Sequence, residues 1–247
     1  MNSTAHTRTV VKRNFALIAP DGWVNSTLPG WSNSQIYVII NQAMGAEFCQ
    51  LLSLMDQNSS GHFKSSALEN FIYIMEGEGH LHQDGDKHKM GPGHFAFLPH
   101  SSEFELSSEK GMKVTIFQKE YQPLAGHQSP EIVRGDIAQV PSELYMDDSQ
   151  LHMQTLLPDS LSFDMAVNIF TYDPGGNLPF VETHVMEHGL IYLSGQGIYR
   201  LDDQWLPVMK DDCIWMAPYC PQWFVAMGKE PAAYLYYKNI NRHPIGQ

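Results

Sequence analysis

Apolar and polar residues alternate along much of the chain. The alternation is clearest in FIYIMEGEGHLH, HFAFLPH, VTIFQKEY, GIYRLDDQWLPV, CIWMAP and AAYLYYK. Neighbouring side chains of a β-strand point to opposite faces, so this pattern predicts many short strands. Gly, Pro, Asn and Asp separate the runs, as is typical of a sandwich or barrel. The clearest helical window is short, SELYMDDS at 142–149. The predicted fold class is therefore all-β.

The two halves of the chain resemble each other. Residues 69–104 and 187–224 share an aromatic strand, a Gly-x-Gly turn, a hairpin, a second turn and an apolar strand that ends in proline. Gly77 lines up with Gly195, Pro99 with Pro218, and Lys119 with Lys238. A nearly constant offset of about half the chain indicates an internal duplication. We expect two tandem barrel domains, residues 1–125 and 126–247, joined by a linker near residues 122–136.

Composition excludes several classes of protein. A hydrophobic fraction of 43% with 17% charged residues suits a packed core, and a net charge of −12 argues against a nucleic-acid partner. No apolar run reaches the roughly 18 residues of a membrane span, and no apolar segment follows the basic N-terminal residues as in a secretory signal. The three cysteines are odd in number and lack CxxC spacing, so we expect free thiols and a cytoplasmic location.

The segment VETHVMEHG carries a candidate metal site. Glu182 and His184 are two positions apart, so they share one face if the segment is a strand. His188 begins the next predicted strand and can return to the same point. Glu187 is expected to be solvated, or to accept a hydrogen bond from a histidine N–H. Spacing alone leaves a surface cluster of ionisable residues as the alternative.

The combination of motifs resembles a known family. Two β-barrel repeats with a His/Glu motif before a glycine turn are similar to cupins, here a bicupin of jelly-roll barrels. ETHVMEHG, LSGQG, APYxxQ and the C-terminal Y-x-Y-x-K-x-x-NR resemble the (S)-ureidoglycine aminohydrolase family. The resemblance extends from about Asn14 to Arg242, and only its C-terminal motifs are specific.

The resemblance implies one metal ion per chain, in the C-terminal cupin. Its ligands would be Glu182, His184, His188 and, from the second cupin motif, Gln222. Cupins commonly have a glutamate at the position of His188 and a histidine at that of Gln222, so this set departs from the usual pattern. Two nitrogens and two oxygens suit Mn²⁺ better than Zn²⁺, which prefers a four-coordinate N/S set.

The N-terminal repeat is expected to lack a metal. By the same offset, Lys64, Ser66 and Asn70 occupy the positions of Glu182, His184 and His188, and Glu103 falls near that of Gln222. Lysine and serine do not hold a divalent ion there, so this half is predicted to be a structural partner.

The last apolar strand supplies candidate substrate contacts. Tyr234, Tyr236 and Lys238 alternate, so they share one face, and that face is either the barrel interior or an outer surface from which Lys238 extends into solvent. The resemblance implies that Tyr234 and Lys238 bind substrate and act in catalysis together with Glu182. It also implies substrate contacts from Glu182 and Gln222, with Tyr199 as a further candidate for the same pocket.

The resemblance further implies the activity. It is the Mn²⁺-dependent release of ammonia from (S)-ureidoglycine, giving (S)-ureidoglycolate in purine degradation. The alternatives are another metal-dependent bicupin, an oxygenase or isomerase of a small acid, and a cupin that binds a small molecule without catalysis. We also expect a homo-oligomer. Asp211 stands where cupins usually have glycine, so a positive φ is expected there.

Overall fold

The computed structural model describes residues 7–239, in which strands dominate and the helices are short 3₁₀ turns. One sheet contains β3 (Asn25–Ser26), β4 (Trp31–Ile40), β5 (Cys49–Lys64), β6 (Leu68–Gly77), β7 (Gly79–Gln83), β8 (Asp86–Met90), β9 (His94–Leu98), β10 (Glu103–Ser108), β11 (Met112–Glu120) and β12 (Val133–Asp136). A second contains β1 (Val10–Val11), β2 (Phe15–Ile18), β13 (Glu143–Tyr145), β14 (Asp148–Thr155), β15 (Ala166–Tyr172), β16 (His188–Ser194), β19 (Cys213–Met216) and β21 (Ala232–Lys238). The third contains β17 (Gln196–Leu201), β18 (Gln204–Met209) and β20 (Gln222–Ala226). The 3₁₀ turns are η1 (Pro20–Gly22), η2 (Gln42–Met44) and η3 (Ile137–Gln139). The all-β prediction is confirmed.

The helix predicted at 142–149 is wrong. This segment is the β-hairpin of β13 and β14, in which Tyr145 pairs with Asp148. Met146 and Asp147 form the two-residue turn, and both have positive φ, 55° and 60°. A two-residue turn with two positive φ angles matches the right-handed twist of a hairpin, so the turn geometry prevails over the weak helical pattern.

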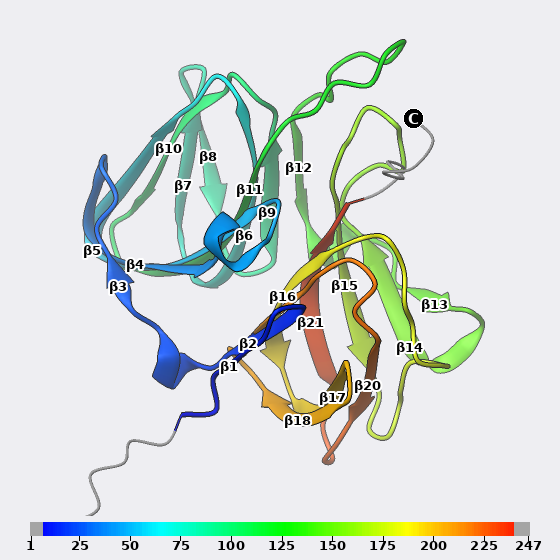
Figure 1. The fold of residues 1–247 in the computed structure, drawn as a ribbon. Helices are drawn as coiled ribbons and strands as arrows, with labels where there is room; N and C mark the ends of the chain where they lie inside the picture. The colour runs from blue at the N-terminus through cyan, green and yellow to red at the C-terminus, as the bar shows by residue number, and fades with distance from the viewer. Residues whose placement is uncertain (1–6, 240–247) are drawn as a thin grey trace, which may run out of the picture.

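Each half of the chain contributes to the sheet of the other half, the N-terminal half with β1 and β2 and the C-terminal half with β12. β2 pairs with β19, and β12 pairs with β9, so the two strands cross between the barrels in opposite directions (Figure 1). The two exchanges match in register, because Ile18 opposes Cys213 as Asp136 opposes His94. A 3₁₀ turn follows each strand, η1 after β2 and η3 after β12. The predicted domain boundary between residues 125 and 126 stays a prediction. β2 and β12 each pair with a strand from the other side of that boundary.

Residues 7–239 form three hydrophobic clusters. One fills the N-terminal barrel, a second fills the C-terminal barrel, and the largest lies between the two. In the cluster between the barrels, Tyr237 of β21 stacks on Phe48 and Phe117, with ring centroids 4.2 and 5.7 Å apart. The central strands are therefore buried on both faces, and β19 shows no exposed position at all.

Lys119 is not the structural counterpart of Lys238, although the two align in sequence. His188 pairs with Lys238 across β16 and β21, whereas Asn70 pairs with Gln118 across β6 and β11. Gln118 therefore occupies the place of Lys238. Because strand side chains alternate, a slip of one residue turns Lys119 out of the barrel. The ammonium group of Lys119 instead pairs with the fully buried carboxylate of Asp164, with 2.7 Å between Nζ and Oδ2.

The N-terminal segment and the turn before β19 are tied to their surroundings by charge. The guanidinium of Arg8 makes two hydrogen bonds of 2.7 Å to the buried carboxylate of Asp212, which also accepts from the Met209 N–H. Asp211 has φ 74°, which confirms the expected positive angle. Its carboxylate pairs with Lys113 of the other half at 2.6 Å.

The three cysteines are free thiols, with Cys213 and Cys220 buried. None of the helices within residues 7–239 has the length and apolar character that a bilayer crossing requires.

Replacing Arg8 with methionine should lower the free energy of unfolding by about 1–3 kcal/mol, because Asp212 would stay buried without its cation. Arg8→Lys should lose less, since it keeps the charge but not the bidentate geometry. Urea denaturation measures both. Arg13→Met removes a cation from an exposed position nearby and is the matched control. An equal loss in that control would show that the Arg8–Asp212 contact is not the cause.

Candidate active site

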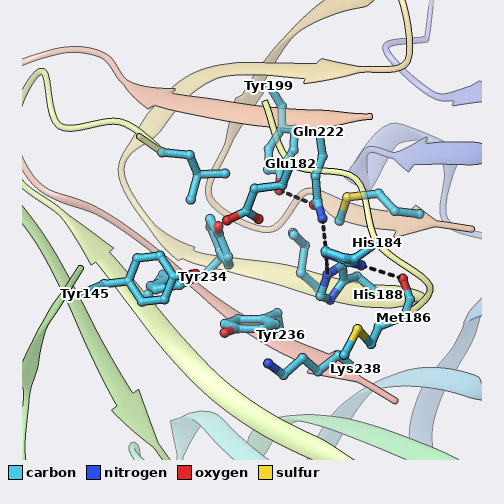
Figure 2. A pocket seen from close by; sticks show the side chains of 14 residues that line it. Tyr145, Glu182, His184, Met186, His188, Tyr199, Gln222, Tyr234, Tyr236 and Lys238 are labelled. Carbon is cyan, nitrogen blue, oxygen red and sulfur yellow. Dashed lines mark hydrogen bonds between the residues drawn. The ribbon is translucent and has the colours of Figure 1, made fainter. Parts of the chain in front are cut away.

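A cavity of about 220 Å³ lies inside the C-terminal barrel (Figure 2). It brings together all seven residues that the sequence singled out for this site, and their chemical roles stay predictions. Its wall consists of residues from the barrel strands and from the loop before β16: Tyr145, Phe170, Leu178, Glu182, His184, Met186, His188, Leu190, Tyr199, Met216, Gln222, Tyr234, Tyr236 and Lys238.

Glu182 and His184 lie in a loop and not in a strand, so the expected strand placement is wrong. The loop is held by backbone hydrogen bonds instead. Glu182 and Gln222 exchange two of them, at 2.8 and 2.9 Å, and the Tyr219 N–H donates to the His184 carbonyl at 2.7 Å. These bonds fix the loop on the end of β20. Both side chains reach the cavity because the loop follows the barrel rim.

Two imidazoles present unprotonated nitrogens to the cavity. The Nδ1–H of His184 donates to the Met186 carbonyl at 3.0 Å, and that of His188 to the Tyr237 carbonyl at 3.2 Å. A carbonyl only accepts, so in each neutral ring Nε2 is left with a lone pair. The two Nε2 atoms are 3.0 Å apart. Burial lowers the pKa of His184 and lowers that of His188 well below its usual range, which keeps both rings neutral.

The amide of Gln222 completes this side of the cavity. Its Nε2 donates to His184 Nε2 at 2.8 Å, and its Oε1 accepts from the Tyr199 hydroxyl at 3.2 Å. Turning the amide by 180° would aim Oε1 at the histidines. A phenol can also accept, so Tyr199 would then take a hydrogen bond from the amide NH₂. Gln222 can therefore serve as an oxygen ligand without losing its support.

The carboxylate of Glu182 shares the cavity but turns toward Tyr145. Burial raises the pKa of Glu182, and the positive charge of Lys238 and a hydrogen bond from Tyr145 act in the opposite direction. Within residues 7–239, no three His, Cys, Asp or Glu side chains converge as closely as a metal ion requires. The paired lone pairs of His184 and His188 fit a metal ion, and a rotation of Glu182 toward them would complete a set of two nitrogens and two oxygens.

Lys238 lies on the inner face of β21, together with Tyr234 and Tyr236. The inward placement of this face, which the alternation left open, is thereby settled. Burial lowers the pKa of Lys238, and Glu182 and Asp159 raise it in part. The cavity therefore holds one cation opposite one carboxylate, with apolar and aromatic walls between them.

A chain of phenols stands behind the cavity. The hydroxyls of Tyr172 and Tyr234 are 2.7 Å apart, both residues are buried, and the Tyr234 hydroxyl in turn interacts with Tyr199. The chain thus runs from Tyr172 through Tyr234 and Tyr199 to the amide of Gln222. Tyr192 packs against Tyr234 in the same cluster, but its buried hydroxyl has no hydrogen-bond partner in the described chain.

Sequence reasoning missed Tyr145 and Tyr172. Tyr145 was hidden by the wrong helical reading of its hairpin, and Tyr172 carries no motif beyond the alternation of its strand. Glu187 was also misread. It is buried, accepts from the Glu47 N–H at 3.0 Å and from Trp215 Nε1 at 3.3 Å, and burial raises its pKa to about 7. It bonds to no histidine, because both ring N–H groups go to backbone carbonyls.

The two buried phenols should respond differently to removal of their hydroxyls. Tyr172→Phe should lower the free energy of unfolding by about 1 kcal/mol, since it breaks the bond to Tyr234. Tyr192→Phe is the matched control and should cause no loss, because it removes a polar atom that has no partner. Urea denaturation of the two variants beside the unmodified chain measures this. A larger loss in Tyr192→Phe would contradict the hydrogen-bond assignment.

No family model matches the chain. A protein of Oryza sativa subsp. japonica named probable (S)-ureidoglycine aminohydrolase is 36% identical over 245 residues, which cover 97% of this chain and 77% of that protein. The (S)-ureidoglycine aminohydrolase of Escherichia coli (strain K12) is 32% identical over 241 residues, covering 95% and 92%.

Solved structures agree with this relationship. The putative glyoxylate-induced protein from Pseudomonas aeruginosa superposes with a TM-score of 0.89 at 29% identity, covering 100% of this chain and 96% of that one. A cupin 2 conserved barrel domain protein from Leptotrichia buccalis has a TM-score of 0.65 at 13% identity, covering 90% and 95%, and shows the fold alone. The chain has the cupin fold and belongs to the (S)-ureidoglycine aminohydrolase family.

Proposed function

We propose that the protein replaces the α-amine of (S)-ureidoglycine with water, giving (S)-ureidoglycolate and ammonia. The observation that carries the proposal is the convergence of two neutral histidines, the Gln222 amide and Lys238 in one cavity, which also holds a carboxylate. The names of the relatives supply the substrate. A cavity of about 220 Å³ suits a molecule of this size, which carries an amine, a ureido group and a carboxylate.

A Mn²⁺ ion is proposed as the cofactor. His184 and His188 would hold it through Nε2, Gln222 through Oε1 after its amide turns, and Glu182 through its carboxylate. When bound, such an ion polarises the substrate and fixes its orientation. The proposal for manganese rests on the mixed nitrogen and oxygen donor set, which also admits other divalent ions.

Lys238 and Tyr234 are proposed to hold the substrate. An ammonium group surrounded by apolar walls is a strong partner for a carboxylate, so Lys238 would bind the carboxylate of ureidoglycine. The Tyr234 hydroxyl, which is supported by Tyr172, would donate to a carboxylate or ureido oxygen. Tyr199 would act indirectly, by orienting the Gln222 amide.

Glu182 is proposed to move the proton. Burial raises the pKa of Glu182, which favours its protonated form relative to that of an exposed glutamate. The carboxylic acid would give its proton to the amine as the C–N bond breaks, releasing ammonia and leaving an acylimine-like carbon. Water would then add to that carbon and return a proton to the Glu182 carboxylate. Atoms and charge balance, and the carboxyl group is restored.

Small-molecule binding is the interaction that the family relationship supports, and a homo-oligomer stays a prediction. Phe180 and Val181 are exposed beside Glu182 on the same loop, 52% and 40% accessible. These apolar side chains would be candidates for burial between subunits.

Ammonia release tests the proposed reaction. (S)-Ureidoglycine generated in situ from allantoate should release ammonia only after Mn²⁺ is returned to the chelated protein. His184→Ala should lower the rate by at least about 100-fold, because it removes a ligand. Ammonia release from the chelated protein, or from His184→Ala, at the rate of the metal-loaded unmodified protein would contradict a metal-dependent site. Oxygen-dependent turnover of another acid would favour the oxygenase alternative, and bound Mn²⁺ without turnover would favour a binding protein.

Steady-state kinetics of two variants should separate the proposed roles. Lys238→Met should raise KM by about tenfold or more, because the substrate carboxylate loses its cation. Glu182→Gln should lower kcat by at least about 100-fold, because an amide does not carry the proton. Metal content is measured in both, so that a loss of the ion is not mistaken for a loss of proton transfer. Full turnover in metal-loaded Glu182→Gln would refute the proton-transfer role.

A further inference from the structure

The N-terminal barrel has a cavity of its own, of about 430 Å³. Trp31 and Phe63 form an aromatic wall, with ring centroids 5.5 Å apart at nearly right angles. Asn70 and Gln118 also line it, although they are only 3% and 8% exposed. Lys64 lies at its rim.

Backbone pairing shows that this cavity is the counterpart of the active-site cavity. Lys64 opposes Glu103 in one barrel as Glu182 opposes Gln222 in the other. Asn70 opposes Gln118 as His188 opposes Lys238. The duplication has therefore kept a second cavity at the same place, and its inner polar groups are two neutral amides.

The side-chain amides of Asn70 and Gln118 use only part of their hydrogen-bonding capacity on each other. Gln118 Nε2 donates to Asn70 Oδ1 at 2.6 Å, and no other side-chain hydrogen bond involves either residue within the described chain. This leaves the Asn70 NH₂ as a donor and the Gln118 carbonyl oxygen as an acceptor. Neither atom is among the fully enclosed polar atoms that lack a partner, so both remain accessible in the cavity. Turning both amides would exchange the two roles but would still leave one donor and one acceptor.

Lys64 places an ammonium group at the rim of this cavity. Lys64 Nζ is 2.6 Å from one oxygen of Glu103, and His62 Nε2 is 3.0 Å from the other. An ammonium group has three N–H donors, so Lys64 can bind a second carboxylate without releasing Glu103. The cavity thus combines a donor–acceptor pair at its base, an aromatic wall and, at its mouth, a lysine ammonium group that is paired with Glu103.

We infer that the N-terminal cavity is a second binding site, for small acids that carry a terminal ureido or carboxamide group. Such a group presents N–H and C=O side by side on one edge, which matches the Gln118 acceptor and the Asn70 donor. The ligand carboxylate would lie toward Lys64. The cavity lacks histidine or carboxylate at its base, so this site would bind without the chemistry of the C-terminal cavity. The inference does not depend on the proposed reaction.

N-Carbamoylglycine is a suitable probe, and N-acetylglycine is its matched control ligand. The acetyl compound has a trans secondary amide, whose N–H and C=O point in opposite directions. It therefore cannot satisfy the donor and acceptor together. Calorimetric titration is made with the full chain carrying His184→Ala and His188→Ala, freed of metal, so that the C-terminal cavity has lost its imidazoles. We expect one N-carbamoylglycine per chain, with N-acetylglycine at least tenfold weaker.

Asn70→Leu and Gln118→Met, made in that same background, keep the shape of the side chains and remove one amide each. Each should weaken binding of N-carbamoylglycine by about tenfold or more, because a buried hydrogen bond is lost. Each single variant leaves one amide unpaired, which lowers stability. The double variant removes both partners together and is the better-folded test. Circular dichroism and thermal unfolding verify that the fold is retained.

Three results would overturn the inference. They are the absence of binding in the background protein, unchanged affinity in the folded double variant, and equal affinity for N-acetylglycine. None of them bears on ammonia release by the unmodified chain, so failure of this site and failure of the proposed reaction remain distinguishable.

Discussion

The central strands of each barrel are buried on both faces, and the position of the site depends on this constraint. On β16 and β21, one face carries His188, Tyr234 and Lys238 into the cavity. The other face carries Ile191 and Tyr237 into the cluster between the barrels. Because strand side chains alternate, packing the outer face fixes the register of the inner one. The contact between the barrels therefore positions the catalytic candidates, although it contributes no chemistry itself.

Backbone carbonyls then determine what the cavity can bind. The carbonyl of Tyr237 holds the ring of His188, and that of Met186 holds the ring of His184, so both Nε2 lone pairs face inward. The phenol chain behind Gln222 tolerates either orientation of its amide. The site is thus prepared for a cation on one side, while Lys238 supplies a positive charge on the other.

The duplication preserved geometry and changed chemistry. The same paired positions hold His188 with Lys238 in one barrel and Asn70 with Gln118 in the other. One cavity contains two imidazoles, a carboxylate and a lysine, and the other offers only neutral hydrogen-bonding groups at its base.

The sequence by itself predicted the all-β fold class, the repeat and seven of the residues that line the C-terminal cavity, since alternation and motif spacing are local properties. It failed where tertiary contacts decide. Turn geometry made a hairpin of residues 142–149, and the exchange of β2 and β12 has no local signal. A one-residue difference in register turns Lys119 toward the interface between the barrels, whereas Lys238 points into its own barrel. Only the folded chain shows which face of a strand is covered, because that depends on what packs against it.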